Sequence, residues 1–318
     1  MDASIAIVNW NTCDLLDQCL RSLYETSTGF DFETIVVDNA SEDESVSMVK
    51  AKYPNVHLIQ NKVNLGFATG CNIAFKHSQG RYFILLNSDT IVLENALGKL
   101  VEFMNSHRRV GVTGCRLLNQ DGTLQRSASC YPDLLTELFD ALYLSKLFPQ
   151  SRLFGRYAMT YWDFEDTREV DFVGGSCMIV RRDAIEEVGL LDEDYFMYTE
   201  EADWCYRFFM HDWKIYYYPK ARIIHLGGQS SNRYGNDILV HLYSSRNRFI
   251  SKHYGHMAAA MHKSIIVLGA VLRLPIFEAM KLMKKGDPNG SSFQIKLLKW
   301  AFQGIQCESG RNGATECG

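Results

Sequence analysis

Strand-like and helix-like segments alternate from the first residues of the chain. The β-branched, apolar stretch SIAIVNW, residues 4–10, is followed by apolar residues at helical spacing, and ETIVVDNAS, residues 33–41, repeats the strand signal. After further helix-compatible stretches come a short strand in NVHLIQN, residues 55–61, and another in RYFILLNSD, residues 81–89. This order predicts an α/β fold whose central sheet is mostly parallel and flanked by helices on both faces.

The composition excludes several classes of protein. The chain has 318 residues, 47% of them hydrophobic, which is enough to bury one large core or two fused ones. A net charge of −4 and an isoelectric point near 6.1 show no basic excess, so no nucleic-acid partner is expected. Nine cysteines without a CxxC pair predict reduced thiols in the cytoplasm.

Apolar runs long enough to cross a membrane are not expected. The first residues lack the basic stretch and long apolar run of a signal peptide. The longest apolar run, IIVLGAVL at residues 265–272, is well short of the roughly 20 residues needed to span a bilayer. We therefore expect a cytoplasmic chain without a transmembrane helix.

Polar residues follow three of the predicted strands. They are Asn9, the pair Asp38 and Asn39, and the run from Asn87 to Asp89. Each alone is compatible with a turn or a helix cap. Ligands of such sheets bind beyond the carboxyl ends of the strands, so three polar strand ends together predict one shared crevice.

The pattern from Val110 to about Arg168 is less regular and predicts a mobile or substrate-facing region. It contains a turn at NQDG, residues 119–122, and a helical stretch PDLLTELFDALYL. The next segment, VDFVGGSCMIVRR, is strand-like and carries Gly174 and Gly175. Two glycines inside a strand predict close approach of a ligand or of another backbone.

Three carboxylates, Glu200, Glu201 and Asp203, lie where a helix is predicted to begin. Acids are favoured in a first helical turn by the helix dipole, which is a sufficient local reason for them. The surrounding apolar and aromatic residues, YFMY at 195–198 and Trp204, favour a position in an apolar wall instead. There, loss of water raises the pKa of a carboxyl group and makes it a candidate general base.

His225 follows a strand-like stretch and precedes two glycines. A lone histidine is usually structural, but at a strand end it could complete a divalent-metal site with Asp89. A hard cation shared with a diphosphate takes several ligands from phosphate oxygens and offsets charge on a departing nucleoside diphosphate.

The composition changes after about residue 235. The stretch from Lys252 to Lys299 contains eight lysines or arginines and only two acids, and helix-compatible segments alternate with apolar ones. A basic, amphipathic stretch of this kind predicts peripheral membrane contact through residues 252–300. Ordinary amphipathic helices share the pattern, so a helix pair packed on the core or on the second subunit of a homodimer stays an alternative. Residues 304–318 suggest a disordered tail.

Seven segments, in this order, resemble the family 2 inverting glycosyltransferases and especially their rhamnosyltransferase-like branch. They are IAIVNWN, IVVDNASEDES, NLGFATGCNIAF, LLNSDT, VGGSCMIVRRDAIEEVGLLDE, MYTEEADWCYR and IIHLGGQS. The resemblance covers about residues 3–231 and implies a GT-A fold, a nucleotide-sugar donor and a divalent metal, Mg²⁺ or Mn²⁺. We expect a GT-A domain at 1–235, with a nucleotide-binding half at about 1–105 and an acceptor half at 106–235, then a helical extension at 236–303.

The same resemblance implies roles for individual residues. Asp89 is the implied metal ligand, joined by His225, although the usual DXD motif is here NSD, with one carboxylate and Asn87 in the first position. Glu201 is the implied catalytic base, with Glu200 and Asp203 as substitutes because the family usually has aspartate there. The implied nucleotide-sugar-binding residues are Val8, Asn9, Asp38, Asn39, Asn64, Gly66, Asn72, Asn87, Ser88, Asp89, Gly174, Gly175 and Arg207.

The sequence thus predicts an enzyme that moves a sugar to a hydroxyl group of a glycan or polyprenyl-linked glycan in cell-surface polysaccharide synthesis. The expected donor is dTDP-rhamnose, and the expected location is the inner face of the plasma membrane. A UDP-hexose donor is the alternative within the same fold. A non-catalytic sugar-nucleotide-binding module, favoured only by Asn87, and a nucleotidyltransferase are alternatives of other classes.

Overall fold

The computed structural model describes residues 1–227, 237–283 and 290–303. The predicted tail at 304–318 lies outside these stretches. The chain divides into two compact units: unit 1 is formed by Met1–Cys130 and Asp163–Arg233, and unit 2 by Tyr131–Trp162 and Tyr234–Gly318. Residues 131–162, which the sequence assigned to the acceptor half, group with the C-terminal helices in the structure.

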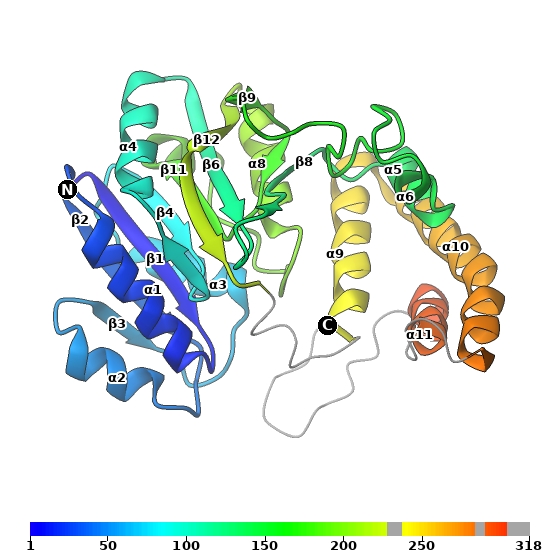
Figure 1. Ribbon diagram of the computed structural model, residues 1–318, viewed down its shortest axis with the longest axis horizontal. Helices are drawn as coiled ribbons and strands as arrows, with labels where there is room; N and C mark the ends of the chain where they lie inside the picture. The colour runs from blue at the N-terminus through cyan, green and yellow to red at the C-terminus, as the bar shows by residue number, and fades with distance from the viewer. Residues whose placement is uncertain (228–236, 284–289, 304–318) are drawn as a thin grey trace. The chain divides into compact units, whose positions relative to one another are not determined.

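The first part of unit 1 is the expected alternation of strands and helices (Figure 1). Its strands pair in parallel in the order β3-β2-β1-β4, so their carboxyl ends share one edge. The elements are β1 (Ala3–Asn9), α1 (Cys13–Thr26), β2 (Phe32–Asp38), α2 (Ser45–Lys52), β3 (His57–Gln60), α3 (Phe67–Lys76) and β4 (Tyr82–Leu86).

The second part of unit 1 extends the same sheet with a mixed pairing. β11 is antiparallel to both β4 and β6, β6 is parallel to β12, and β5 is antiparallel to β12. The flanked α/β sheet is confirmed, and parallel pairing holds for the strands before residue 87 and for β6 with β12. The elements are β5 (Thr90–Val92), α4 (Ala96–Ser106), β6 (Val110–Leu118), β7 (Leu124–Gln125), β8 (Ala128–Ser129), β9 (Arg168–Glu169), β10 (Phe172–Val173), β11 (Cys177–Arg181), α7 (Arg182–Val188), α8 (Glu200–Met210) and β12 (Lys214–His225).

The predicted strand around the glycine pair is in fact two strands. β10 pairs with β8 in a separate two-stranded sheet, whereas β11 belongs to the central sheet. Gly174 and Gly175 therefore lie in the turn between them. A long-range partner for β10, which no local pattern specifies, is the reason for this difference.

The two faces of β1 meet different helices. Ile5 and Ile7 are fully buried in one core cluster that includes Leu16 of α1, and each such side chain contributes about 1.5–3 kcal/mol. Val8 points to the opposite face because side chains alternate along a strand. There a Cβ on Gly70 of α3 would lie 2.9 Å from a Val8 methyl group. Glycine thus allows α3 to pack closely on β1 and sets the position of its amino-terminal end.

Unit 2 is helical. α10 contacts α5, α9 and α11 (Figure 1, yellow to red for the C-terminal helices). Its centre is ionic, because the buried Glu137 carboxylate pairs with Arg246 and with His262. No helix among the described residues is long and apolar enough to cross a membrane. The helices are α5 (Leu134–Ala141), α6 (Leu144–Leu147), α9 (Asp237–Tyr254), α10 (His256–Leu282) and α11 (Gly290–Gln303).

Candidate active site

Hydrogen bonds join the polar residues that follow three parallel strands of unit 1. The Asn9 amide donates to Asp38 Oδ1 over 3.0 Å. Thr12 Oγ1 donates to Asn9 Oδ1 over 2.7 Å and lies 3.0 Å from Ser88 Oγ. The strand ends therefore form one polar edge, as the sequence suggested. Because Asn9 and Asp38 are buried and bonded to each other, their side chains build the floor of this edge.

The loop before α3 lies beside this floor. Asn39 Nδ2 donates to the Gly66 carbonyl oxygen over 3.0 Å, and Asn64 Oδ1 accepts from the Gly66 N–H over 2.9 Å. Gly66 has a φ of 82°, and a Cβ there would lie 2.8 Å from the Phe196 carbonyl oxygen. Only glycine tolerates both conditions. The contact holds α3 next to the segment that leads into α8.

Asp89 and His225 approach each other at the end of the sheet. Pairing of β5 with β12 places His225 opposite Thr90, and His225 Nε2 lies 3.3 Å from Asp89 Oδ1. Asn87 Nδ2 lies 3.5 Å from the same nitrogen. The sequence predicted this pair, and the structure brings it together.

The Asp89–His225 pair fits a divalent cation. A carboxylate oxygen and an imidazole nitrogen are both ligands that Mn²⁺ accepts, and the carboxylate also suits Mg²⁺. Within the described stretches, no group of three or more His, Cys, Asp or Glu side chains could hold a metal ion. A cation at this pair would therefore take its remaining ligands from phosphate oxygens and water.

An unusual backbone turn introduces the two glutamates of α8. Tyr198 and Thr199 both have a φ of 69°, a left-handed conformation that costs of order 1–3 kcal/mol in a non-glycine residue. The helix begins immediately afterwards with Glu200, which is 5% exposed, and Glu201, which is partly buried. The Oε2 atoms of both accept no hydrogen bond from any described residue.

Burial perturbs the acidity of this pair. It raises the pKa of Glu201 to about 7, and together with the charge of Glu201 it raises the pKa of Glu200 well above its usual range. The neighbouring Cys71 thiol is also buried, and burial with the charge of Glu200 raises its pKa. A carboxyl group whose pKa lies near neutrality is suited to take a proton from a substrate.

Asp203 and Arg207 have structural partners. Asp203 is fully buried and accepts from Arg207 Nε over 2.9 Å. The other guanidinium nitrogens donate to the carbonyl oxygens of Val188 over 3.2 Å and Leu190 over 2.7 Å. These bonds tie α8 to the end of α7. The geometry favours this tie over the predicted roles of Asp203 as a substitute base and of Arg207 as a nucleotide-sugar-binding residue.

The side chain of Asn72 also forms its hydrogen bonds with other residues of the protein. Its Nδ2 donates to the Leu191 carbonyl oxygen over 2.9 Å and to Glu193 Oε1 over 2.8 Å, and its Oδ1 accepts from the Leu191 N–H. With 3% of its surface exposed, Asn72 anchors α3 to the segment before α8. This arrangement favours a structural role over the predicted nucleotide contact.

The glycine pair lies beside α3. The Gly174 N–H donates to the Ser127 carbonyl oxygen over 2.8 Å, which fixes the turn between β10 and β11. A Cβ on Gly175 would lie 3.3 Å from the ring of Phe67 at the start of α3. The close approach that the two glycines predicted is thus made by other parts of the protein: by the Ser127 backbone at Gly174 and by the Phe67 ring at Gly175.

Sequence reasoning missed three contributors to the site. Thr12 links two strand ends, and Ser41 Oγ accepts from the Asn9 amide over 3.2 Å. Both closely follow strand ends, which is a usable signal. Gln125 accepts from His225 Nδ1 over 2.6 Å across 100 positions of sequence, and no local pattern marks it.

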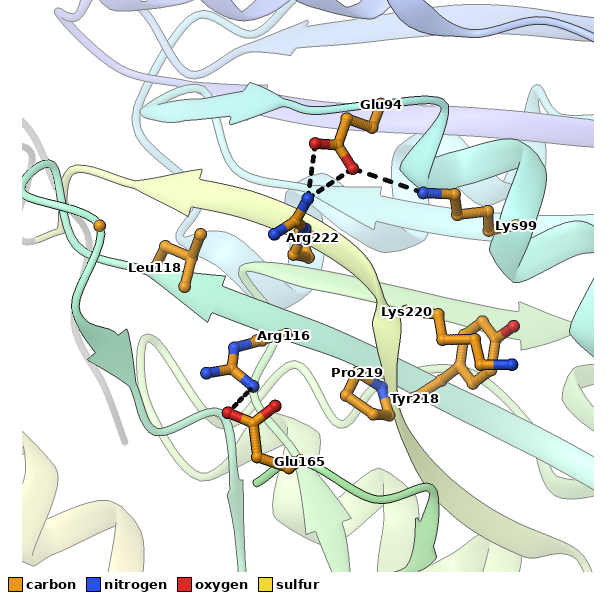
Figure 2. A pocket seen from close by; sticks show the side chains of 10 residues that line it. Glu94, Lys99, Arg116, Leu118, Glu165, Tyr218, Pro219, Lys220 and Arg222 are labelled. Atoms are coloured by element: carbon orange, nitrogen blue, oxygen red, sulfur yellow. Dashed lines mark hydrogen bonds and ion pairs between the residues drawn. The ribbon is translucent and has the colours of Figure 1, made fainter. Parts of the chain in front are cut away.

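A separate hollow of about 710 Å³ opens on unit 1. Figure 2 shows the ion pairs that line it. Glu94 pairs with Arg222 at 2.5 Å and with Lys99 at 3.7 Å, and Arg116 pairs with Glu165 at 2.7 Å. Its lining includes none of the residues that the sequence nominated, as far as the described chain shows. Since its acids are already paired with cations, we assign the chemistry to the strand-end edge.

The sheet order and its helices define the GT-A fold of glycosyltransferases. The mannosyltransferase PcManGT from Pyrobaculum calidifontis, solved in complex with GDP-Man and Mn²⁺, matches with a TM-score of 0.55 at 16% identity, over 96% of this chain and 87% of that chain. S. aureus TarS matches with a TM-score of 0.54 at 14% identity, over 96% of this chain and 49% of that chain. These similarities confirm the predicted fold.

The model of the family "Glycosyl transferase family 2" matches residues 4–189, more than half of the chain, and the protein belongs to this family. N-acetylglucosaminyl-diphospho-decaprenol L-rhamnosyltransferase of Mycobacterium tuberculosis is 27% identical over 240 residues, covering 72% of this chain and 77% of the relative. Rhamnosyltransferase WbbL of Escherichia coli is 23% identical over 276 residues, covering 81% and 98%. The resemblance to the family 2 glycosyltransferases and the enzyme class, a glycosyltransferase, are confirmed.

Proposed function

We propose that this glycosyltransferase moves rhamnose from dTDP-rhamnose to a hydroxyl group of a glycan or polyprenyl-linked glycan in cell-surface polysaccharide synthesis, with inversion at the anomeric carbon. The observation that carries the reaction is the pair of the buried Glu200 and the partly buried Glu201, which lies in the same unit as the polar strand-end edge. The names of the mycobacterial and E. coli relatives support rhamnose as the donor sugar.

The first half of unit 1 holds the nucleotide in this proposal. The backbone at Val8 and Asn9, above the floor that Asp38 and Asn39 help to build, contacts the base and ribose. Asn64, Gly66 and Ser88 border the same edge. Asp89 and His225 hold a divalent cation, which when bound supplies positive charge against the departing diphosphate. Asn87 lies beside them and donates to a phosphate oxygen or a water molecule.

Glu201 acts as the base in this proposal. Its carboxylate takes the proton of the acceptor hydroxyl while the hydroxyl oxygen forms a bond to the anomeric carbon. The bond from that carbon to the diphosphate oxygen breaks in the same displacement, and the bonding electrons leave with the nucleoside diphosphate. Attack opposite the leaving group inverts the configuration. Burial and the charge of Glu201 raise the pKa of Glu200 well above its usual range, which favours a protonated Glu200 beside the Glu201 carboxylate.

A titration of donors by calorimetry tests the donor. The panel is dTDP-rhamnose, UDP-glucose, UDP-galactose, UDP-N-acetylglucosamine and GDP-mannose, each with Mn²⁺ and again with a chelator. We expect tight binding of dTDP-rhamnose alone, weakened by the chelator. Preference for a UDP-hexose would reject rhamnose and keep the enzyme class. No binding of any donor would favour a non-catalytic module.

We also propose that unit 2 rests on the inner face of the plasma membrane, close to a lipid-linked acceptor. Along α10, large apolar side chains recur on one face and stay exposed: Met257, Met261, Leu268, Leu272 and Ile276 are 44–81% exposed. Besides the buried Arg273, which pairs with Asp140, the helices α10 and α11 carry four lysines against one glutamate. A second copy of these helices would bring like charges together, whereas anionic lipid offers the complementary charge.

Flotation with liposomes tests this contact. We expect the full chain to float with anionic vesicles and less with zwitterionic ones, because both apolar and basic side chains take part. The double variant Met261→Asp/Leu272→Asp is expected to stay in the soluble layer. Phe209→Asp, a control at an exposed apolar residue of unit 1, should float like wild type. Equal flotation of all three proteins would reject α10 as the contact.

A further inference from the structure

The turn between β6 and β7 carries a chain of hydrogen bonds whose direction is fixed at one end. Asp121 Oδ1 accepts from the Thr123 hydroxyl over 2.6 Å and from the Thr123 N–H over 2.9 Å. These two bonds lower the pKa of Asp121, so it is a carboxylate at neutral pH and can only accept. The single hydroxyl proton of Thr123 is therefore committed to Asp121.

The direction passes from Thr123 to Gln125. Because its proton is committed, Thr123 Oγ1 accepts from Asn119 Nδ2, over 2.9 Å. This places the Asn119 carbonyl oxygen toward Gln125, and it accepts from Gln125 Nε2 over 3.1 Å. The Gln125 amide donates again to the His225 backbone oxygen over 3.3 Å. The orientations of the Asn119 and Gln125 amides both follow from the carboxylate of Asp121. If either amide were reversed, its carbonyl oxygen would face another hydrogen-bond acceptor.

The chain ends on the ring of His225. With its NH₂ group engaged, Gln125 presents Oε1 to His225 Nδ1 over 2.6 Å, so Nδ1 carries the proton and donates it. In the neutral ring, Nε2 then holds a lone pair. That lone pair lies 3.3 Å from Asp89 Oδ1. Asn87 Nδ2 lies 3.5 Å from the same nitrogen. With neither a proton nor a metal cation at Nε2, Nε2 and Oδ1 repel each other at this distance.

The sheet explains how residues so far apart in sequence meet. β6 pairs with β7 through Leu117 and Gln125, and it pairs in parallel with β12, which ends at His225. The hairpin and His225 therefore lie on opposite sides of β6, and β6 holds both in place. The turn itself is closed by the Asn119 N–H donating to the Thr123 carbonyl oxygen over 2.8 Å.

We propose that the hairpin from Asn119 to Gln125 is a positioning device for a metal ligand. Gln125, oriented by Asn119 and Thr123, fixes the Nδ1–H tautomer of His225 and presents Nε2 to a divalent cation shared with Asp89. Gln125 is thus a positioning residue that touches neither substrate nor metal. A hydrogen bond to the far nitrogen of a metal-binding histidine raises its basicity and fixes its ring, and loss of such a partner typically weakens metal binding about 10–100-fold. This inference rests on the metal site of the proposed function.

Two measurements on the full chain test the device. Long-range ¹H–¹⁵N spectra of histidine-labelled protein, recorded without metal and assigned with His225→Gln, report the tautomer. Electron paramagnetic resonance titration with Mn²⁺, alone and with dTDP, reports affinity. In wild type we expect the Nδ1–H form and measurable Mn²⁺ binding. In Gln125→Leu we expect a shift toward the Nε2–H form and binding weakened about 10–100-fold.

Matched variants separate positioning from folding. Gln125→Glu keeps an acceptor for His225 Nδ1 and is expected to retain the tautomer and most of the affinity. Gln120→Leu makes the same change at the exposed neighbouring glutamine and should behave as wild type. An unchanged tautomer and affinity in Gln125→Leu would overturn the proposal, as would an Nε2–H form in wild type.

Failure here is distinguishable from failure of the proposed function. A wild-type protein that transfers sugar in the presence of chelator and binds no Mn²⁺ overturns the metal-positioning device and leaves the transferase standing. A protein with the expected tautomer and the expected loss of Mn²⁺ binding in Gln125→Leu supports the device. If that protein binds no nucleotide sugar, only the donor proposal fails.

Discussion

Glu137 of unit 2 and Glu200 of unit 1 are buried to a similar degree, 2% and 5% exposed, but their pKa values shift in opposite directions. Burial alone raises the pKa of Glu137 in unit 2, but Arg246 at 3.1 Å and His262 at 3.3 Å outweigh it, and the pKa is lowered. In unit 1, burial raises the pKa of Glu200 and Glu201. The difference teaches that the neighbouring cations, rather than depth, decide the charge of a buried acid.

The two sites therefore suit different tasks. Glu137 is held as a carboxylate and fastens three helices of unit 2, because Arg246 lies on α9 and His262 on α10. Glu200 and Glu201 each have an oxygen that accepts no hydrogen bond from a described residue, so taking up a proton there breaks no internal bond. A buried ion pair fixes structure, whereas an uncompensated pair is ready to exchange a proton.

The largest effect is expected from Glu201→Gln. Removing a positioned general base typically lowers a rate by about 10²–10⁴-fold, and the isosteric amide should leave the unfolding midpoint and donor binding unchanged or raised. Steady-state transfer assays and calorimetry measure this. Glu186→Gln, at an exposed glutamate of unit 1, is the control. Transfer at the wild-type rate in Glu201→Gln would reject Glu201 as the base.

Glu137→Gln is expected to lower stability, whereas Glu201→Gln lowers the transfer rate. Glu137→Gln leaves the partly buried Arg246 without its carboxylate, and breaking a buried pair in this way costs about 3–5 kcal/mol. Urea unfolding should show this loss in unit 2, against Glu278→Gln, an exposed glutamate of α10, as control. If both variants unfold alike, the ionic centre of unit 2 has no net role in stability.

The smallest effect is a difference in pH dependence. Glu201 has a folded pKa of about 7 against an ordinary 4.5, so the folded state holds more protons between these values and stability falls as pH rises through them. Glu201→Gln should remove this fall and stabilise the protein by about 1–3 kcal/mol at pH 8. Glu137 has the opposite sign: its contribution is present above 4.5 and is lost as pH falls through its lowered pKa. Unfolding free energies at pH 3, pH 5 and pH 8 distinguish the two, because Glu137 acts between the first two values and Glu201 between the last two.

Much of the donor edge could be predicted because its determinants are local. The polar residues Asn9 and Asp38 end apolar strands, Asp89 follows another closely, and parallel strands end at one edge. The helical start of Glu200 and Glu201 was visible in the same way. Each of these features needs only a few neighbouring residues to be recognised.

The rest depended on partners distant in sequence. Asn72 and Arg207 carry side chains suited to a ligand, but Leu191 and Leu190 supply their bonding partners from another segment. The glycine pair changes from strand to turn because β10 pairs with β8. Gln125 has no signature at all, since its role arises from strands of one sheet meeting 100 positions apart.

The antiparallel pairing of β11 with β4 has a consequence for the nascent chain during translation. In the finished sheet, β4 lies between β1 and β11, yet β11 begins at Cys177, 91 residues after β4 ends at Leu86. At typical rates of synthesis the intervening residues take roughly 5–20 s to emerge. Throughout that interval the apolar strand YFILL has an open edge able to pair with another nascent chain. The strand order thus sets the period in which this protein most needs a chaperone.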